Sequence, residues 1–111
     1  MTQNHIKGLI AAPFTPMYSD GGLNIGIIKD YYHFLKTNGV AGAFICGSTG
    51  EGVSLTQTEK KQVVNAWAEA TRGDADFKVM VFLGGTCLDD CIDLAQYTRE
   101  SELFAVSFTA P

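Results

Sequence analysis

The feature that most constrains the fold of this chain is a strand, a glycine-rich turn and a helix start that follow one another within residues 40–56. The apolar run AFIC (residues 43–46) leads directly into GSTGEG (residues 47–52). A strand that passes into a helix through such a short turn is typical of parallel α/β proteins. Ligands of these proteins bind beyond the carboxyl ends of the strands, so the turn is a candidate binding site.

The residues of this turn suit an anion. Gly47, Gly50 and Gly52 allow positive φ angles and a close approach of the main chain to a ligand, while Ser48 and Thr49 add hydroxyl and N–H donors. The turn is neither a Walker loop nor a dinucleotide fingerprint, because no Gly-Lys-Ser/Thr follows it and the GxGxxG spacing is absent. A tight turn whose hydroxyls only satisfy local amides fits the same residues equally well.

The stretch after the turn predicts a helix with defined ends. Thr56 and Glu59 have the spacing of a capping box, so we expect the helix to begin at Gln57 and to run to about Thr71. Three apolar side chains of this helix recur at helical spacing and are expected to face the core: Val63, Val64 and Trp67.

Apolar runs and helical patterns alternate along the whole chain. The expected strands lie at residues 6–14, 43–46, 78–83 and 103–108, and the expected helices at residues 25–38, at 57–71 and from Leu88 onward. This alternation predicts right-handed crossovers and a parallel sheet, and both a doubly wound sheet and half of a (β/α)8 barrel satisfy it. In the last helix the face expected to be buried consists of Leu88, Cys91, Ile92 and Ala95.

Charge and hydropathy exclude some classes of partner. The net charge of −4 argues against a nucleic-acid surface, and the one basic pair, Lys60 and Lys61, is expected on a solvated helix face. The longest apolar runs are far shorter than the ~20 residues that span a bilayer, and the first residues are polar. We therefore expect a cytoplasmic protein that binds neither nucleic acid nor membrane.

The remaining polar residues favour structural over catalytic roles. The odd number of cysteines, Cys46, Cys87 and Cys91, predicts reduced thiols, and no further ligand completes a metal set around them. Thr15, just after the first strand, is expected to stabilise its own turn rather than to face a ligand. His33 lies among aromatic residues and is expected to be a packing or surface histidine.

Three segments together resemble the N-acetylneuraminate lyase and dihydrodipicolinate synthase family: GLIAAPFTPM (residues 8–17), GSTGEG (residues 47–52) and SFTAP (residues 107–111). The run GSTGEGVSLTQTEKKQV is more similar to the sialic acid lyase branch of that family. The resemblance implies a class I aldolase-type (β/α)8 barrel, which typically needs ~250 residues. Residues 1–111 would then be the amino-terminal half of one barrel domain, with about four parallel strands and three helices, truncated after the fourth strand.

The resemblance also implies roles for the residues of the turn. Ser48 and Thr49 match the hydroxyl pair that binds the carboxylate of a pyruvyl group, and Gly47, Gly50 and Glu51 would support the turn. Glu51 is expected to be structural, because an ionised carboxylate facing another carboxylate is repelled.

No catalytic residue is assigned within the chain. The resemblance places the lysine that forms a Schiff base with pyruvate, and the tyrosine that transfers protons, beyond Pro111. Lys78 is expected at the amino-terminal end of its strand, away from barrel active sites.

The resemblance implies an enzyme that cleaves N-acetylneuraminate reversibly to pyruvate and N-acetylmannosamine through a lysine imine, without a metal or other cofactor, and that forms a homotetramer. Dihydrodipicolinate synthase or another pyruvate-dependent aldolase is the alternative within the family. Two hypotheses of other classes remain: a non-catalytic truncated association module, and an independent flavodoxin-like domain that binds a phosphate.

Overall fold

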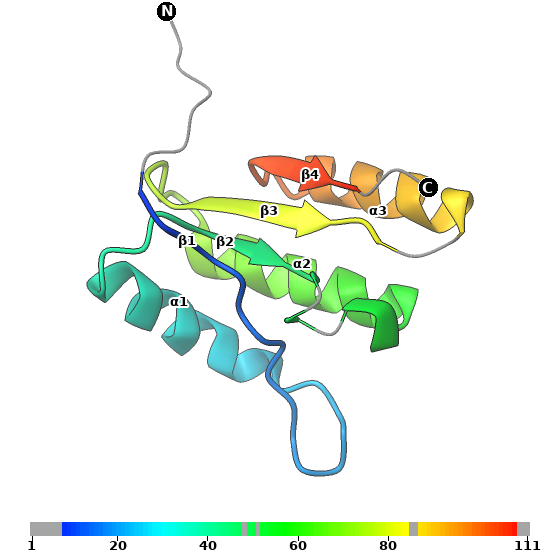
Figure 1. Ribbon diagram of the computed structural model, residues 1–111, viewed down its shortest axis with the longest axis horizontal. Helices are drawn as coiled ribbons and strands as arrows, with labels where there is room; N and C mark the ends of the chain where they lie inside the picture. Colours follow the sequence, from blue (N-terminus) through cyan, green and yellow to red (C-terminus); the bar gives the residue numbers. More distant parts are fainter. Residues whose placement is uncertain (1–7, 48, 51, 85–86, 109–111) are drawn as a thin grey trace, which may run out of the picture.

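A computed structural model of the chain describes residues 8–47, 49–50, 52–84 and 87–108. Strands and helices alternate along it (Figure 1). The strands are β1 (Ile10–Ala11), β2 (Gly42–Ile45), β3 (Lys78–Phe82) and β4 (Ala105–Ser107), and the α-helices are α1 (Ile28–Thr37), α2 (Gln57–Thr71) and α3 (Leu88–Glu100). Two 3-10 turns, η1 (Ile25–Ile27) and η2 (Gly52–Ser54), precede α1 and α2.

The order of the strands distinguishes the two architectures that the sequence left open. All strand pairs are parallel and the order is β1-β2-β3-β4, with Ala43 opposite Val79 and Val81 opposite Val106. Each helix contacts the next, α1 with α2 and α2 with α3, so the three form one layer against the sheet (Figure 1). A doubly wound sheet would reverse its strand order and carry helices on both faces. The arrangement is that of half of a (β/α)8 barrel, as predicted.

The two faces of the sheet differ in their surroundings. Side chains that face the helices, such as Ile45 and Val81, are fully buried. On the opposite face, which lines the interior of a (β/α)8 barrel, Phe44 and Phe82 are half-buried, with their ring centroids 5.8 Å apart. Since both faces carry apolar side chains, β2 and the body of β3 after Lys78 are continuously apolar, as expected for a parallel sheet with two covered faces.

Helix α2 supplies the centre of the core. Val63, Val64 and Trp67 are buried, as the helical spacing predicted. The Trp67 ring is parallel to that of Phe77 within 1°, with the centroids 6.5 Å apart, and its centroid lies 6.0 Å from that of Tyr31. Large aromatic rings of this kind contribute much of the apolar area that a small core buries.

The predicted buried face of α3 was partly wrong. Leu88 and Ile92 are 72% and 49% exposed, whereas Leu94 and Thr98 are fully buried. Thr98 fits the core because its hydroxyl donates a hydrogen bond to the carbonyl of Leu94 at 2.8 Å, so no polar group is left unsatisfied. Cys91 and Ala95 do pack against the core, as predicted, so the buried stripe is shifted toward Leu94 and Thr98 rather than reversed.

The outer strands are shorter than expected. The first strand was predicted over residues 6–14, but β1 covers only Ile10–Ala11, while residues 6 and 7 lie outside the described part of the chain. Pro13 ends the strand because it has no N–H to donate to a neighbour.

Among the described residues, no helix is long and apolar enough to cross a membrane.

Candidate functional site

The candidate site is the turn that joins β2 to α2, at the carboxyl end of the sheet (Figure 1). Thr49 is exposed there, whereas Gly47 and Gly50 are buried. Ser48 and Glu51, the other two residues assigned to the site, lie outside the described residues. The turn begins with a hydrogen bond from the Gly52 N–H to the Gly47 carbonyl at 3.1 Å.

Close packing restricts the glycines of the turn, most strongly at Gly52. A Cβ at Gly52 would lie 2.0 Å from the carbonyl oxygen of Cys46, and one at Gly47 would lie 2.8 Å from the ring of Phe44. Neither Gly47 nor Gly50 has a positive φ. The left-handed residue at this point is Cys46, with φ of 61°. Gly47 and Gly50 therefore do not adopt the positive φ that glycine allows, whereas a close approach of neighbouring atoms is observed at both.

Thr15 joins the loop after β1 to this turn. Its side chain is 6% exposed, and its hydroxyl donates a hydrogen bond to the carbonyl of Gly50 at 2.6 Å. Thr15 was expected to stabilise its own turn, but its hydrogen bond reaches a different loop. Since its partner lies 35 residues away, no local pattern could have indicated this contact.

Cys46 directly precedes the turn, and its buried thiol is poorly reactive. Burial raises the pKa of its thiol to about 11, although the charge of Lys60 acts in the opposite direction. A thiol that is neutral at physiological pH is a poor nucleophile. The arrangement therefore gives Cys46 a packing role rather than a catalytic one.

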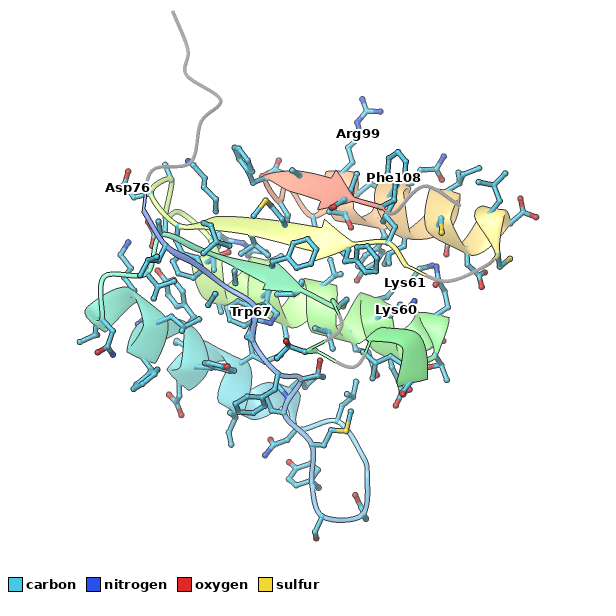
Figure 2. All side chains as sticks on the ribbon, in the orientation of Figure 1. Lys60, Lys61, Trp67, Asp76, Arg99 and Phe108 are labelled. Carbon is cyan, nitrogen blue, oxygen red and sulfur yellow. The ribbon has the colours of Figure 1, made fainter. Side chains whose placement is uncertain are left out.

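Lys60 contradicts the expectation of a solvated basic pair. Its side chain is 8% exposed, because position 60 belongs to the same helical stripe as Val63 and Trp67. Lys61 points away from this stripe and forms an ion pair with Asp93 of α3 at 2.6 Å (Figure 2). The periodicity of α2 continues through its first turn regardless of the charge at position 60.

The amino terminus of α2 is occupied by its own cap. The Thr56 hydroxyl accepts from the Glu59 N–H at 3.1 Å, and the Glu59 carboxylate accepts from the Thr56 N–H at 2.9 Å. These two donors are therefore not free for a ligand. No group of metal-ligating side chains occurs among the described residues.

A cavity of about 680 Å³ lies at the opposite end of the sheet. Its lining includes Thr71, Asp74, Lys78 and Phe104, which surround the amino ends of β3 and β4. In (β/α)8 barrels the active site lies at the carboxyl ends of the strands, whereas the other end contributes stability. The turn after β2, and not this cavity, is therefore the candidate site.

Known proteins resemble the chain over nearly its whole length. The sequence profile of the Dihydrodipicolinate synthetase family matches residues 5–111. N-acetylneuraminate lyase from Xenopus tropicalis is 38% identical over 107 residues, which cover 96% of this chain and 35% of that protein. The chain thus spans about a third of the length of such relatives.

Solved structures agree with this. N-acetylneuraminate lyase from Proteus mirabilis superposes with a TM-score of 0.85 at 35% identity, covering 91% of this chain and 34% of that one. A prophage protein from E. coli of the dihydrodipicolinic acid synthase family, solved in complex with pyruvate, superposes with a TM-score of 0.83 at 26% identity, covering 91% and 33% of the two chains.

Proposed function

The chain belongs to the dihydrodipicolinate synthetase family, and from this premise we propose that the polypeptide carrying it is a pyruvate-dependent class I aldolase. The turn after β2 seats the carboxylate of the pyruvyl group. The observation that carries the proposal is the geometry of this turn, where Thr49 is exposed at the carboxyl end of the sheet and the Gly50 carbonyl is held by Thr15. Ser48 supplies the second hydroxyl, and Gly47, Gly50 and Glu51 support the turn.

In the proposed reaction, this chain supplies the groups that bind the substrate carboxylate, and the rest of the polypeptide supplies the catalytic lysine. The chain binds the carboxylate, while a lysine beyond residue 111 attacks the neighbouring ketone carbon, and the ketone oxygen leaves as water when the imine forms. The described lysines are poorly placed for this step. Lys78 begins β3 at the opposite end, and Lys60 is buried on the stripe of α2 that faces the core.

The sequence identities to named relatives support N-acetylneuraminate as the substrate. Identity is 35% to the Proteus mirabilis lyase but 26% to the dihydrodipicolinic acid synthase family member solved with pyruvate. We therefore propose reversible cleavage to pyruvate and N-acetylmannosamine, by a cytoplasmic homotetramer that requires no metal or other cofactor. Another pyruvate-dependent aldolase of the family remains the alternative.

Borohydride trapping tests the reaction class. The complete polypeptide is incubated with pyruvate, reduced, and weighed by intact mass spectrometry with peptide mapping. We expect a reduced pyruvate adduct on a lysine outside residues 1–111, and much less adduct with the uncharged methyl ester of pyruvate. Absence of an adduct would refute the aldolase and favour an association module. An adduct on Lys60 would refute the proposal that the catalytic lysine lies outside residues 1–111.

Release of pyruvate from N-acetylneuraminate distinguishes the lyase from other aldolases of the family.

Substitutions in the turn test the carboxylate seat. Thr49→Val removes a donor to a charged group, so the pyruvate concentration for half-maximal trapping should rise about 10- to 100-fold. Glu51→Gln, which keeps the size of a supporting side chain, should raise this concentration much less. An equal rise in both variants would contradict the supporting role of Glu51.

A further inference from the structure

The contact between Thr15 and Gly50 is a buried hydrogen bond between two loops. The Thr15 side chain is almost fully buried, and its hydroxyl reaches the Gly50 carbonyl across two loops that follow different strands. In Figure 1 the chain after β1 passes close to the end of β2, where this turn begins. The hydrogen bond therefore links the candidate site to a second loop.

Packing leaves Gly50 little freedom between these loops. A Cβ at Gly50 would lie 3.2 Å from the Pro13 carbonyl oxygen, 3.3 Å from the Thr15 hydroxyl and 3.2 Å from the Cys46 nitrogen. Pro13 and Pro16 are buried on either side of Thr15, and the Pro16 carbonyl accepts from the Asn24 N–H at 2.9 Å. The loop after β1 is thus itself anchored and can act as a fixed support.

The direction of the Gly50 carbonyl matters for an anion. A carbonyl oxygen is the negative end of the peptide dipole, so one that pointed into the seat would repel a bound carboxylate. The Thr15 hydroxyl holds this oxygen toward the loop after β1. Groups that are fixed before the ligand arrives do not have to be reorganised when it binds.

We propose that Thr15 is a positioning residue for the carboxylate seat: through the Gly50 carbonyl it holds the turn in the conformation that accepts an anion. This inference rests on the proposed function, because it concerns binding of the pyruvyl carboxylate. Thr15 acts through Gly50 and does not touch the substrate.

The test compares Thr15→Val, which lacks the hydroxyl, with Thr15→Ser, which keeps it, in the complete polypeptide. Thr15→Val should raise the pyruvate concentration for half-maximal borohydride trapping about tenfold, the effect of losing one buried hydrogen bond, with little change in the rate at saturation. Thr15→Ser should stay within about twofold of the parent. Thr15→Ala provides a smaller variant without a hydroxyl, and it should reproduce the shift if Thr15→Val does not fold.

Thr98→Val is the matched control. Thr98 is also buried and its hydroxyl also donates to a backbone carbonyl, that of Leu94, but within α3. It should lower stability and leave half-maximal trapping unchanged. Hydrogen exchange over residues 46–55 should accelerate in Thr15→Val and not in Thr98→Val.

The outcomes separate the two proposals. A parent protein that forms no pyruvate adduct refutes the proposed function, and the role of Thr15 with it. A parent that forms the adduct, with unchanged half-maximal trapping in both variants that lack the hydroxyl, refutes the role of Thr15 alone. The role of Thr15 is also refuted if Thr98→Val shifts half-maximal trapping as much as Thr15→Val does.

Discussion

At the scale of single residues, the three cysteines show how strongly position controls chemistry. Cys46 is buried at the end of β2 with a left-handed backbone, Cys91 is half-buried, and Cys87 is exposed at the start of α3. The half-buried Cys91 sulfur lies 3.6 Å from the carbonyl oxygen of Gly84, as a weak donor. Identical side chains thus differ in their access to solvent.

The reactivity of the thiols should follow this order. In the folded protein a thiol reagent such as DTNB should modify Cys87 first, whereas Cys46 should react only after unfolding. Burial raises the pKa of Cys46 to about 11, so its thiol is almost entirely neutral at pH 8, and burial also blocks access. The measurement is the rate of modification at pH 8, with a Cys87→Ser variant as the control. Rapid modification of Cys46 in the folded protein would contradict its burial.

At the scale of elements, the ends of α2 and α3 are built differently. Helix α2 begins with the complete capping box of Thr56 and Glu59, as its sequence predicted. Helix α3 begins at Leu88, and the side chain of its N-cap residue, Cys87, makes no capping hydrogen bond, although Asp89 and Asp90 lie favourably in the first turn. The turn of the candidate site is therefore followed by a firmly capped helix.

Removing the cap of α2 should destabilise the protein. Thr56→Ala leaves the Glu59 N–H without its partner and should lower the free energy of unfolding by ~1 kcal/mol. Thr56→Ser retains the hydroxyl and is expected to have a much smaller effect. Urea unfolding of the complete polypeptide measures both variants. Equal stability of the alanine variant and the parent would show that the cap contributes nothing.

At the scale of the whole molecule, a polar cluster connects the first helix to the loop before β3. The Tyr32 hydroxyl donates to the Asp74 carboxylate at 2.5 Å, and the Lys36 ammonium pairs with the same carboxylate. The hydrogen bond from Lys36, and then that from Tyr32, lowers the pKa of Asp74. Burial, and then the bond to Asp74, raises the pKa of Tyr32 to about 12.

These shifts predict how stability depends on pH. The folded pKa of Tyr32 lies above its ordinary value of 10.0, so its contribution is complete below pH 10 and is lost between about pH 10 and 12. Asp74 has a lowered pKa, so its contribution is present above its ordinary pKa of 3.8 and is lost as the pH falls through the folded value.

The measurement is the free energy of unfolding at pH 9 and at pH 11.5, in the parent and in Tyr32→Phe. The loss between the two pH values should be smaller in Tyr32→Phe. The Cys46 thiol titrates in the same range, so the difference between the proteins is the informative quantity. An equal loss in both proteins would refute the contribution of Tyr32.

Large apolar side chains are exposed at both edges of the molecule. Phe104, Val106 and Phe108 are exposed along β4, and Ile27 and Phe34 are exposed around α1, at the other side of the sheet. In the proposed complete barrel these surfaces face the neighbouring strands and helices. Association of the 111-residue chain produced alone would be consistent with that assignment.

What the sequence determined by itself is local. The start of α2 at Gln57, its end at Thr71 and its buried side chains were predicted correctly, because a capping box and helical spacing involve residues only a few positions apart. The middle strands were placed within one residue of their observed ends, because short apolar runs between turns mark a buried parallel strand.

Contacts between residues that are distant in the sequence could not be predicted from local patterns. The bond from Thr15 to Gly50 spans 35 positions and that from Tyr32 to Asp74 spans 42. The burial of Lys60 and the buried side of α3 follow from how the helices pack on the sheet. The sequence located the turn of the candidate site, and the fold decided which groups support it, because only packing brings the loops after β1 and β2 together.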